Sequence, residues 1–215
     1  MNHESIYSSD KWRSFNGFSP LIKVYRSFHN LTSDIEFIIN QQTFPITFKK
    51  NKFISSPLHR DNCSYLIFKG IVRGYMKDDN TEITTWLAKE NEFVGGVSNF
   101  LDERATNEEY IQALEDVIAI VVPHSMTKLL HLNYHILNDV DRKMSQLYYR
   151  QACERALISR LHSAEKRYTR FVKSYPELVN RVPQKHIASF LCMRLETLSR
   201  MRAKLASHAI NTSSL

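Results

Sequence analysis

Residues 43–123 limit the possible folds more than any other part of this chain. They contain short runs rich in β-branched and aromatic residues, separated by clusters of Gly, Asn, Asp and Lys. The runs are 43–48, 64–69, 71–77, 81–88, 109–114 and 117–122. Many short strands with turn residues between them are typical of an antiparallel sandwich or a small barrel. Asp79-Asn80 lies between two of these runs and is predicted to form a hairpin tip.

Helical spacing flanks this β-rich region on both sides. Residues 18–42 carry apolar side chains at helical spacing and predict one or two short helices, divided near 30–33. After Pro123 the helical period returns, and it predicts an uninterrupted helix over about 133–153 and a further helix over about 155–174. The pattern therefore predicts an α+β chain with a β-barrel or jelly roll followed by helices.

The long central helix carries an apolar stripe close to a heptad pattern. Its members include Leu137, Val140, Met144 and Leu147. A stripe of this kind can pair with the same helix of a second copy across a two-fold axis, and these four residues are then the dimer interface. It can instead pack on the barrel of its own chain. The sequence leaves both alternatives open.

The segment 182–205 has the pattern of a helix-turn-helix. Pro183 can open the first helix, since its missing N–H would have no partner in the first turn. Ile187 and Leu191 lie one turn apart, and a turn is predicted at Cys192-Met193. The second helix is then marked by an apolar stripe of Leu198, Met201 and Leu205.

Glu196, Ser199 and Arg200 share another face of this second helix, which is therefore open to a partner. Glu and Arg side chains can contact cytosine N4 and guanine O6/N7 in the major groove of DNA. We predict that these three residues contact base edges. Phosphate contacts are predicted for Lys185, Arg194, Thr197, Arg202 and Lys204. An ordinary helical hairpin with a polar solvent face is the alternative.

Positive charge is concentrated in the same part of the chain. Residues 151–215 contain 12 Lys and Arg against 4 Asp and Glu, whereas residues 1–150 contain 17 against 18. Such a distribution is expected of a protein that binds a phosphate backbone. A basic helix lying on a membrane surface is the competing interpretation. It is the weaker one, because the apolar stripe is narrow and is needed for the hairpin core.

Several other classes of protein are not supported. The N-terminus has no continuous apolar segment of a signal peptide, and no run of 18 apolar residues predicts a membrane span. Three widely spaced cysteines suggest free thiols in a reducing cytoplasm, and so a cytoplasmic location. His131 and His135 have a spacing able to bind zinc, but no third ligand is apparent. We therefore predict no metal, no cofactor and no enzyme activity.

Two groups of residues resemble the Crp/Fnr family of bacterial transcription regulators. Residues 187–191 (IASFL) and 196–200 (ETLSR) are similar to the family's IAxxLG…ETxSR pattern, and residues 65–72 resemble its YxIxxGxV hairpin strand. Phe93-Val94-Gly95 resembles the start of its ligand cassette. Two further stretches, 164–168 and 175–178, resemble a subgroup common in the Bacteroidetes.

The resemblance implies an architecture and a function. It implies a cyclic-nucleotide-binding-like effector domain over 1–130, a dimerisation helix over 131–153 and a helix-turn-helix domain over 154–215. Such a protein is expected to be a homodimeric, cytoplasmic regulator that binds a palindromic site on double-stranded DNA, with half-sites about 34 Å apart. RNA polymerase is a further candidate partner. The resemblance does not identify a small-molecule effector.

Departures from the family pattern limit what the barrel can bind. Cyclic-nucleotide-binding members have FxGE followed by an Arg-Ser/Thr pair, but here Gly96 takes the Glu position and Asn107-Glu108 the place of the pair. A phosphate pocket needs positive charge or a nest of amides. We therefore predict that cAMP does not bind in the familiar way. The iron–sulphur branch is not matched either, since no cysteine precedes Cys63.

The C-terminal segment departs in two further ways. Cys192 stands at the turn where the family usually has Gly, so we expect a positive φ there. We expect the thiol to be buried and inert, and a redox-sensitive thiol between the two helices is the alternative. Only about ten residues follow Leu205, too few for the β-hairpin wing of many relatives. Two other functions stay open: a constitutive DNA binder with a purely structural barrel, and a barrel that binds a small molecule or protein while its C-terminal helices serve as an interaction module.

Overall fold

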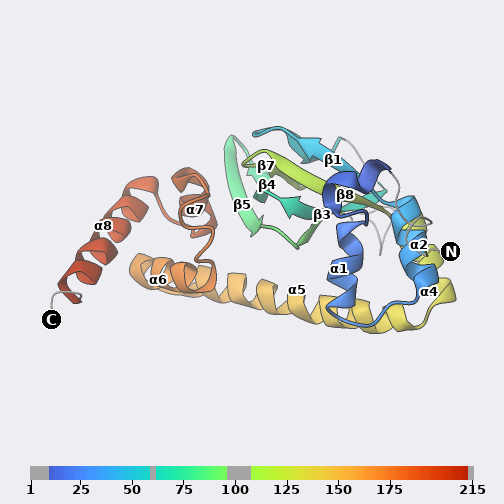
Figure 1. Ribbon diagram of the computed structural model, residues 1–215. Coiled ribbons are helices and arrows are strands. Elements are labelled where there is room, and N and C mark those ends of the chain that lie inside the picture. Colours follow the sequence, from blue (N-terminus) through green and yellow to red (C-terminus); the bar gives the residue numbers. More distant parts are fainter. Residues whose placement is uncertain (1–9, 59–61, 96–107, 213–215) are drawn as a thin grey trace. The chain divides into compact units, whose positions relative to one another are not determined.

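The computed structural model describes residues 10–58, 62–95 and 108–212 (Figure 1). The chain divides into two compact units. The first consists of residues 1–74 and 87–148, and the second of residues 75–86 and 149–215. The second unit thus combines a short piece of the β-rich region with the C-terminal helices.

Within the described residues, two four-stranded sheets form the β-rich part. Their strands are β1 (Phe44–Phe48), β2 (Phe53–Ser55), β3 (Cys63–Lys69), β4 (Val72–Asp78), β5 (Thr81–Ala88), β6 (Phe93–Val94), β7 (Tyr110–Ala113) and β8 (Val117–Pro123). One sheet has the order β1-β8-β3-β6 and the other β2-β7-β4-β5. Two sheets that do not close on themselves are the arrangement of a jelly roll. The predicted β-rich domain is confirmed, while the two shortest strands, β2 and β6, were not predicted.

The connections between strands explain the turn residues of this region. Gly70 follows β3 with φ +103°, and a Cβ there would lie 2.8 Å from the carbonyl oxygen of Asp116. Only glycine therefore fits between β3 and β4. Asp79 has φ 51° at the tip between β4 and β5, as the Asp79-Asn80 pair predicted.

Among the described residues, four short helical elements pack on the first sheet and complete the core of the first unit. They are η2 (Asp10–Phe15), α1 (Pro20–Arg26), α2 (Ser33–Gln42) and α4 (His124–Asn133). Trp12 and Ile39 from these helices are fully buried with Leu66 and Ile120 of the sheet. The Trp12 Nε1 donates to the Asn40 carbonyl at 3.0 Å, which fixes η2 on α2.

The long helix α5 (Ile136–Arg160) differs from its prediction at both ends. The chain leaves helical geometry after Asn133, with Tyr134 at φ −135° and ψ 97°, so α4 and α5 are separate helices. At the other end α5 continues through 154 to Arg160, because no Pro or Gly interrupts that stretch. The next helix starts only where the Ser163 hydroxyl accepts a hydrogen bond from the Lys166 N–H at 3.1 Å.

Three helices follow α5 in the second unit: α6 (Ala164–Ser174), α7 (Gln184–Phe190) and α8 (Leu195–Thr212). Phe171 of α6, Ile187 of α7 and Leu198 of α8 are all 0% exposed. The Phe171 ring lies 5.7 Å from that of Phe190. The three helices therefore share one apolar core, and α8 is held against α7 and α6. No helix in the described ranges is long and apolar enough to cross a membrane.

Candidate nucleic-acid interface

The predicted helix-turn-helix lies in α7 and α8. Backbone hydrogen bonds close the turn between them, from Leu191 N to Ile187 O at 2.9 Å and from Met193 N to Ala188 O at 3.0 Å. Cys192 has φ 51°, so the positive φ predicted at this position is confirmed. Its side chain is exposed, however, and the prediction of a buried thiol is wrong. The turn points Cys192 outward because Ala188 and Leu191 fill the space between the helices.

The outer face of α8 carries the residues predicted to contact bases. Glu196, Ser199 and Arg200 are all exposed, whereas Leu198 between them is fully buried. None of the three has a hydrogen-bond or ion-pair partner among the described residues. One acidic, one hydroxyl and one guanidinium group are therefore available to an external partner along a single ridge.

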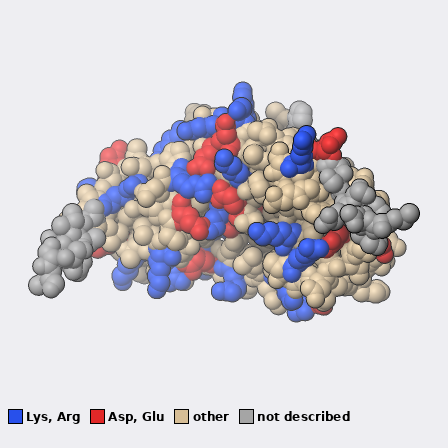
Figure 2. All heavy atoms as spheres, in the orientation of Figure 1, with Lys and Arg blue, Asp and Glu red and all other residues tan. Residues whose placement is uncertain are grey.

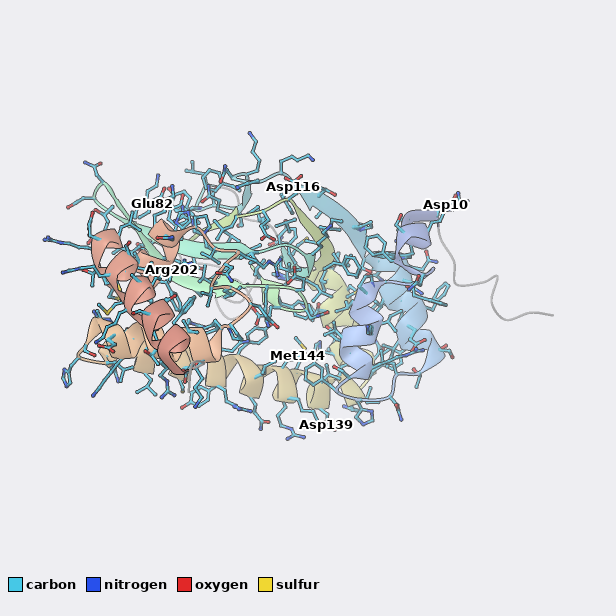
Figure 3. All side chains as sticks on the ribbon, turned by 60° about the vertical axis from the view of Figure 1, so that its left-hand side comes forward. Asp10, Glu82, Asp116, Asp139, Met144 and Arg202 are labelled. Carbon is cyan, nitrogen blue, oxygen red and sulfur yellow. The ribbon has the colours of Figure 1, made fainter. Side chains whose placement is uncertain are left out.

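The five residues predicted to contact phosphate differ in exposure and in whether they are paired within the chain. Lys185 and Arg194 are exposed, while Thr197 and Arg202 are half-buried. Figure 3 shows Arg202 on α8. The Lys204 ammonium lies 2.7 Å from the Glu165 carboxylate of α6. Lys204 is thus already paired within the chain, and of the five it is the least available for a phosphate.

Polar contacts position α6 beneath the helix-turn-helix. The Arg170 guanidinium donates to both carboxylate oxygens of Glu154 on α5, at 2.7 and 2.8 Å, and the Ser174 hydroxyl donates to the same carboxylate at 2.7 Å. Arg167 donates to the Leu161 carbonyl at 2.8 Å and to the Cys192 carbonyl at 3.4 Å. These bonds tie the end of α5 and the turn after α7 to one helix.

The carboxyl group of Glu154 should make the stability of the second unit depend on pH. Its hydrogen bond with Arg170 holds the pKa of the Glu154 carboxyl below its usual range, with a further contribution from Ser174. A depressed pKa in the folded state contributes stability above the pKa of the unfolded chain, and this contribution is lost as pH falls through the folded pKa.

We expect Glu154→Gln to lower the unfolding midpoint of the second unit at pH 7 by a small amount, since the pair is partly exposed. The difference from the wild type should shrink as the pH is lowered through the acidic range. Urea titrations at several pH values measure it, with Asp78→Asn as the control, since Asp78 belongs to the same unit, is exposed and has no ion pair among the described residues. An equal difference at pH 7 and at pH 3 would contradict the assignment.

A contact that the sequence did not predict joins α7 to residues 75–86. The Ser189 hydroxyl accepts a hydrogen bond from the Thr84 N–H at 2.9 Å and lies 3.2 Å from the Glu82 carbonyl. Ser189 is one helical turn after Lys185 on α7. The two partners are separated by more than a hundred residues, so no local pattern signals the contact. It explains why this hairpin belongs to the second unit.

The residues predicted for the dimer interface have different surroundings. Leu137 and Val140 are 1% and 0% exposed and lie in the core of their own chain, packed with residues of α1 and α4. These two residues therefore pack on their own chain, which was the alternative to a dimer contact. Met144 is half-buried, and Leu147 is 43% exposed. Only this later part of the stripe offers surface to a second copy.

Other candidate sites have little support or lie outside the described residues. The altered part of the ligand cassette, with Gly96 and Asn107, falls outside the described ranges. His131 is held by the Thr127 carbonyl at 2.6 Å and by the Asp141 carboxylate. No group of three His, Cys, Asp or Glu residues suited to a metal occurs within the described residues.

Comparison with known proteins supports one fold. No family model matches the sequence, and no curated protein matches it. Solved structures do match: FixK2 from Bradyrhizobium japonicum superposes with a TM-score of 0.66 and 18% identity, over 78% of this chain and 86% of the other. A structure from Eubacterium rectale described as a Crp/Fnr-family transcriptional regulator gives 0.67 and 15%, over 88% and 89%. The protein has the Crp/Fnr fold.

A third structure extends the match. CLP, the c-di-GMP-responsive global regulator of Xanthomonas campestris, superposes with a TM-score of 0.62 and 14% identity over 83% of this chain and 93% of the other. The predicted resemblance to Crp/Fnr regulators is thus confirmed for the fold, with the jelly roll, the long helix and the C-terminal helices in the expected order. Sequence identities this low support the same fold. The function has to be inferred from the residues of the candidate site.

Proposed function

We propose that this protein is a transcription regulator of the Crp/Fnr type that binds specific sites on double-stranded DNA as a homodimer. The observation that carries the proposal is the ridge of Glu196, Ser199 and Arg200 on α8. These side chains are exposed, have no partner among the described residues, and stand on a helix whose opposite face is buried. A second helix with a rigid core behind it and polar groups in front can enter a major groove.

Charge supports the same proposal. The last 65 residues carry the whole net excess of Lys and Arg over Asp and Glu, and Figure 2 shows several of these basic side chains over the C-terminal helices on the face in view. Lys185 and Arg194 are exposed near the N-terminal ends of α7 and α8. Cations there would contact phosphates on either side of the groove, and phosphate contacts supply most non-specific affinity.

Each residue of the ridge has a distinct proposed role. The Glu196 carboxylate would accept a hydrogen bond from cytosine N4, and the Arg200 guanidinium would donate to guanine O6 and N7. The Ser199 hydroxyl would contact a neighbouring base or a phosphate. Two such ridges related by a two-fold axis would contact half-sites about 34 Å apart on a palindrome. The later part of α5, with Met144 and Leu147, is the proposed dimer contact.

Selection of binding sites from randomised duplexes tests the proposal. We expect an enriched palindrome with a G·C pair at the position facing Arg200, together with binding that weakens as salt is raised. If no sequence were enriched, and if the signal with random DNA did not weaken as salt is raised, the proposal of DNA binding would be contradicted. That result would favour a barrel protein whose C-terminal helices form an interaction module. If a palindrome were enriched but no small molecule changed the DNA affinity, the protein would be a constitutive DNA binder with a structural barrel.

Lys185→Ala provides a test of the phosphate contacts. Removing one phosphate contact should weaken binding to all duplexes alike and reduce the slope of log K against log salt by about 1. Lys204→Ala is the matched control, since the Lys204 ammonium is paired with Glu165. We expect a smaller change of slope for Lys204. A change confined to one preferred sequence would show that Lys185 contacts a base.

We further propose that the protein works in the cytoplasm and acts on transcription by RNA polymerase. Binding of cAMP in the familiar way is not expected, because the cassette lacks its Glu and its Arg-Ser pair. Isothermal titration with cAMP checks this expectation, and micromolar affinity would contradict it.

A further inference from the structure

Polar contacts hold the bundle of α6, α7 and α8 at separate places within the second unit. One lies at the end of α5, where the Arg170 guanidinium and the Ser174 hydroxyl donate to the Glu154 carboxylate. Another lies at the Ser189 hydroxyl of α7, which contacts residues 82–84 of β5. The two contacts use different helices of the bundle and different partner elements. They therefore restrain the bundle at two distinct points.

The contact at Ser189 uses the edge of a sheet. In the described part of the chain, β5 is the last strand of the sheet β2-β7-β4-β5. An edge strand presents N–H and C=O groups that have no neighbouring strand, and residues two apart present them on the same side. The Ser189 hydroxyl accepts from the Thr84 N–H at 2.9 Å and donates to the Glu82 carbonyl at 3.2 Å. One side chain thus serves both groups; Figure 3 shows Glu82 near the C-terminal helices.

Ser189 differs from its neighbours on α7 in what it contacts. Ile187, Ala188 and Phe190 are buried in the core of the helical bundle, whereas Ser189 is half-buried against the hairpin. Thr84 is 4% exposed, so water has little access to its hydrogen bond with Ser189. The Ser189 hydroxyl can therefore be removed without opening the core of the helix-turn-helix.

Both strands of the hairpin continue into the first unit. β4 starts at Val72 and β5 ends at Ala88, while residues 75–86 between these ends belong to the second unit. α5 is a further connection in the chain, since it runs through residues 148 and 149, where the units divide. A bundle attached to α5 alone could turn about that attachment as about a hinge. Attachment at a second, separate point removes this freedom.

We propose that Ser189 is a positioning residue that fixes the direction of the α6–α8 bundle, and thereby the spacing of the two half-sites that a homodimer accepts. This role rests on the proposed function, because the ridge on α8 has to meet DNA. Two ridges with fixed directions can bind at once only when the half-sites have one separation. Ridges that are free to turn bind the palindrome more weakly and tolerate other separations.

Three duplexes test this role: the selected palindrome, the same palindrome with one base pair inserted at its centre, and a single half-site. The inserted base pair moves the half-sites apart by about 3.4 Å and turns one relative to the other by about 35°. The spacing penalty is the Kd for the lengthened palindrome divided by the Kd for the original. We expect a penalty of at least about tenfold for the wild type, because both ridges cannot engage the lengthened duplex together.

Ser189→Ala should lower the spacing penalty at least about threefold and weaken the original palindrome about three- to tenfold. Its affinity for the single half-site should stay within about twofold of the wild type, because the ridge and its core are intact. Hydrogen exchange of the Thr84 amide should become faster, since the N–H has lost its acceptor.

Ser159→Ala is the matched control. Ser159 is exposed, belongs to the second unit, and donates to the Ala156 carbonyl of its own helix. We expect the spacing penalty, both affinities and the exchange of the Thr84 amide to stay at their wild-type values in this variant.

Thr84→Pro removes the same hydrogen bond from the strand. Proline has no N–H, and an edge strand tolerates it where the N–H points away from the sheet. The spacing penalty should fall as it does in Ser189→Ala, with the half-site affinity unchanged.

Two results would overturn the role of Ser189. A spacing penalty that stays at the wild-type value in Ser189→Ala, while the Thr84 amide exchanges faster, would leave Ser189 only the protection of a sheet edge. Equal weakening of the half-site and the palindrome would make Ser189 a structural part of the helix-turn-helix. Failure of the wild type to bind any of the three duplexes would contradict the proposed function itself.

Discussion

Replacing Phe171 with alanine is expected to destabilise the second unit by about 3–5 kcal/mol. The ring is fully buried, and it lies 5.5 Å from the ring of Tyr175 and 5.7 Å from that of Phe190, so it joins α6 to α7. Its removal leaves a cavity that the three helices cannot all close. Urea unfolding followed by circular dichroism, with hydrogen exchange of the α6–α8 amides, measures and locates the loss.

The same variant links stability to function. Because the ridge on α8 is positioned by this core, DNA affinity should fall together with the population of the folded unit. Leu195→Ala is the control: Leu195 is in the same unit and 45% exposed, so its truncation should change stability by no more than about 0.5 kcal/mol. An unchanged urea midpoint for Phe171→Ala would contradict the packing described for α6 and α7.

Arg200→Ala is expected to cost about 1–3 kcal/mol in binding to the selected palindrome and to relax specificity at one base pair. The guanidinium is exposed and has no partner among the described residues, so its loss should leave the stability of the chain unchanged. A bidentate contact with guanine carries sequence information, whereas a phosphate contact carries none.

Comparison with Lys185→Ala makes the Arg200 test decisive. Site selection repeated with Arg200→Ala should recover the same palindrome with one position degenerate, and selection with Lys185→Ala should recover the original palindrome. If both variants weakened all sequences to the same extent, the base-contact role of Arg200 would be wrong. Arg200→Lys should restore part of the affinity without the two-bond geometry.

Local patterns were sufficient for much of the fold. Most strands, the short helices before them and the hairpin tip at Asp79 follow from alternation, helical period and turn residues that act within a few residues. The exposed face of α8 was predictable for the same reason, since helix geometry alone places Glu196, Ser199 and Arg200 together. The positive φ at Cys192 was predicted in another way, from the glycine that Crp/Fnr regulators usually have at this turn. The break between α4 and α5 was missed because no Pro or Gly marks it.

The sequence by itself determined the order of the elements and the face that α8 presents, because periodicity and turn preference are properties of neighbouring residues. Only the tertiary structure decided which apolar positions meet the chain's own core. Leu137 and Val140 are buried with residues of α1 and α4, while Leu147, on the same stripe, stays 43% exposed. The pairing of Lys204 with Glu165 and of Ser189 with residues 82–84 was settled in the same way. Such contacts join segments distant in the chain, and their geometry depends on how whole helices and sheets pack.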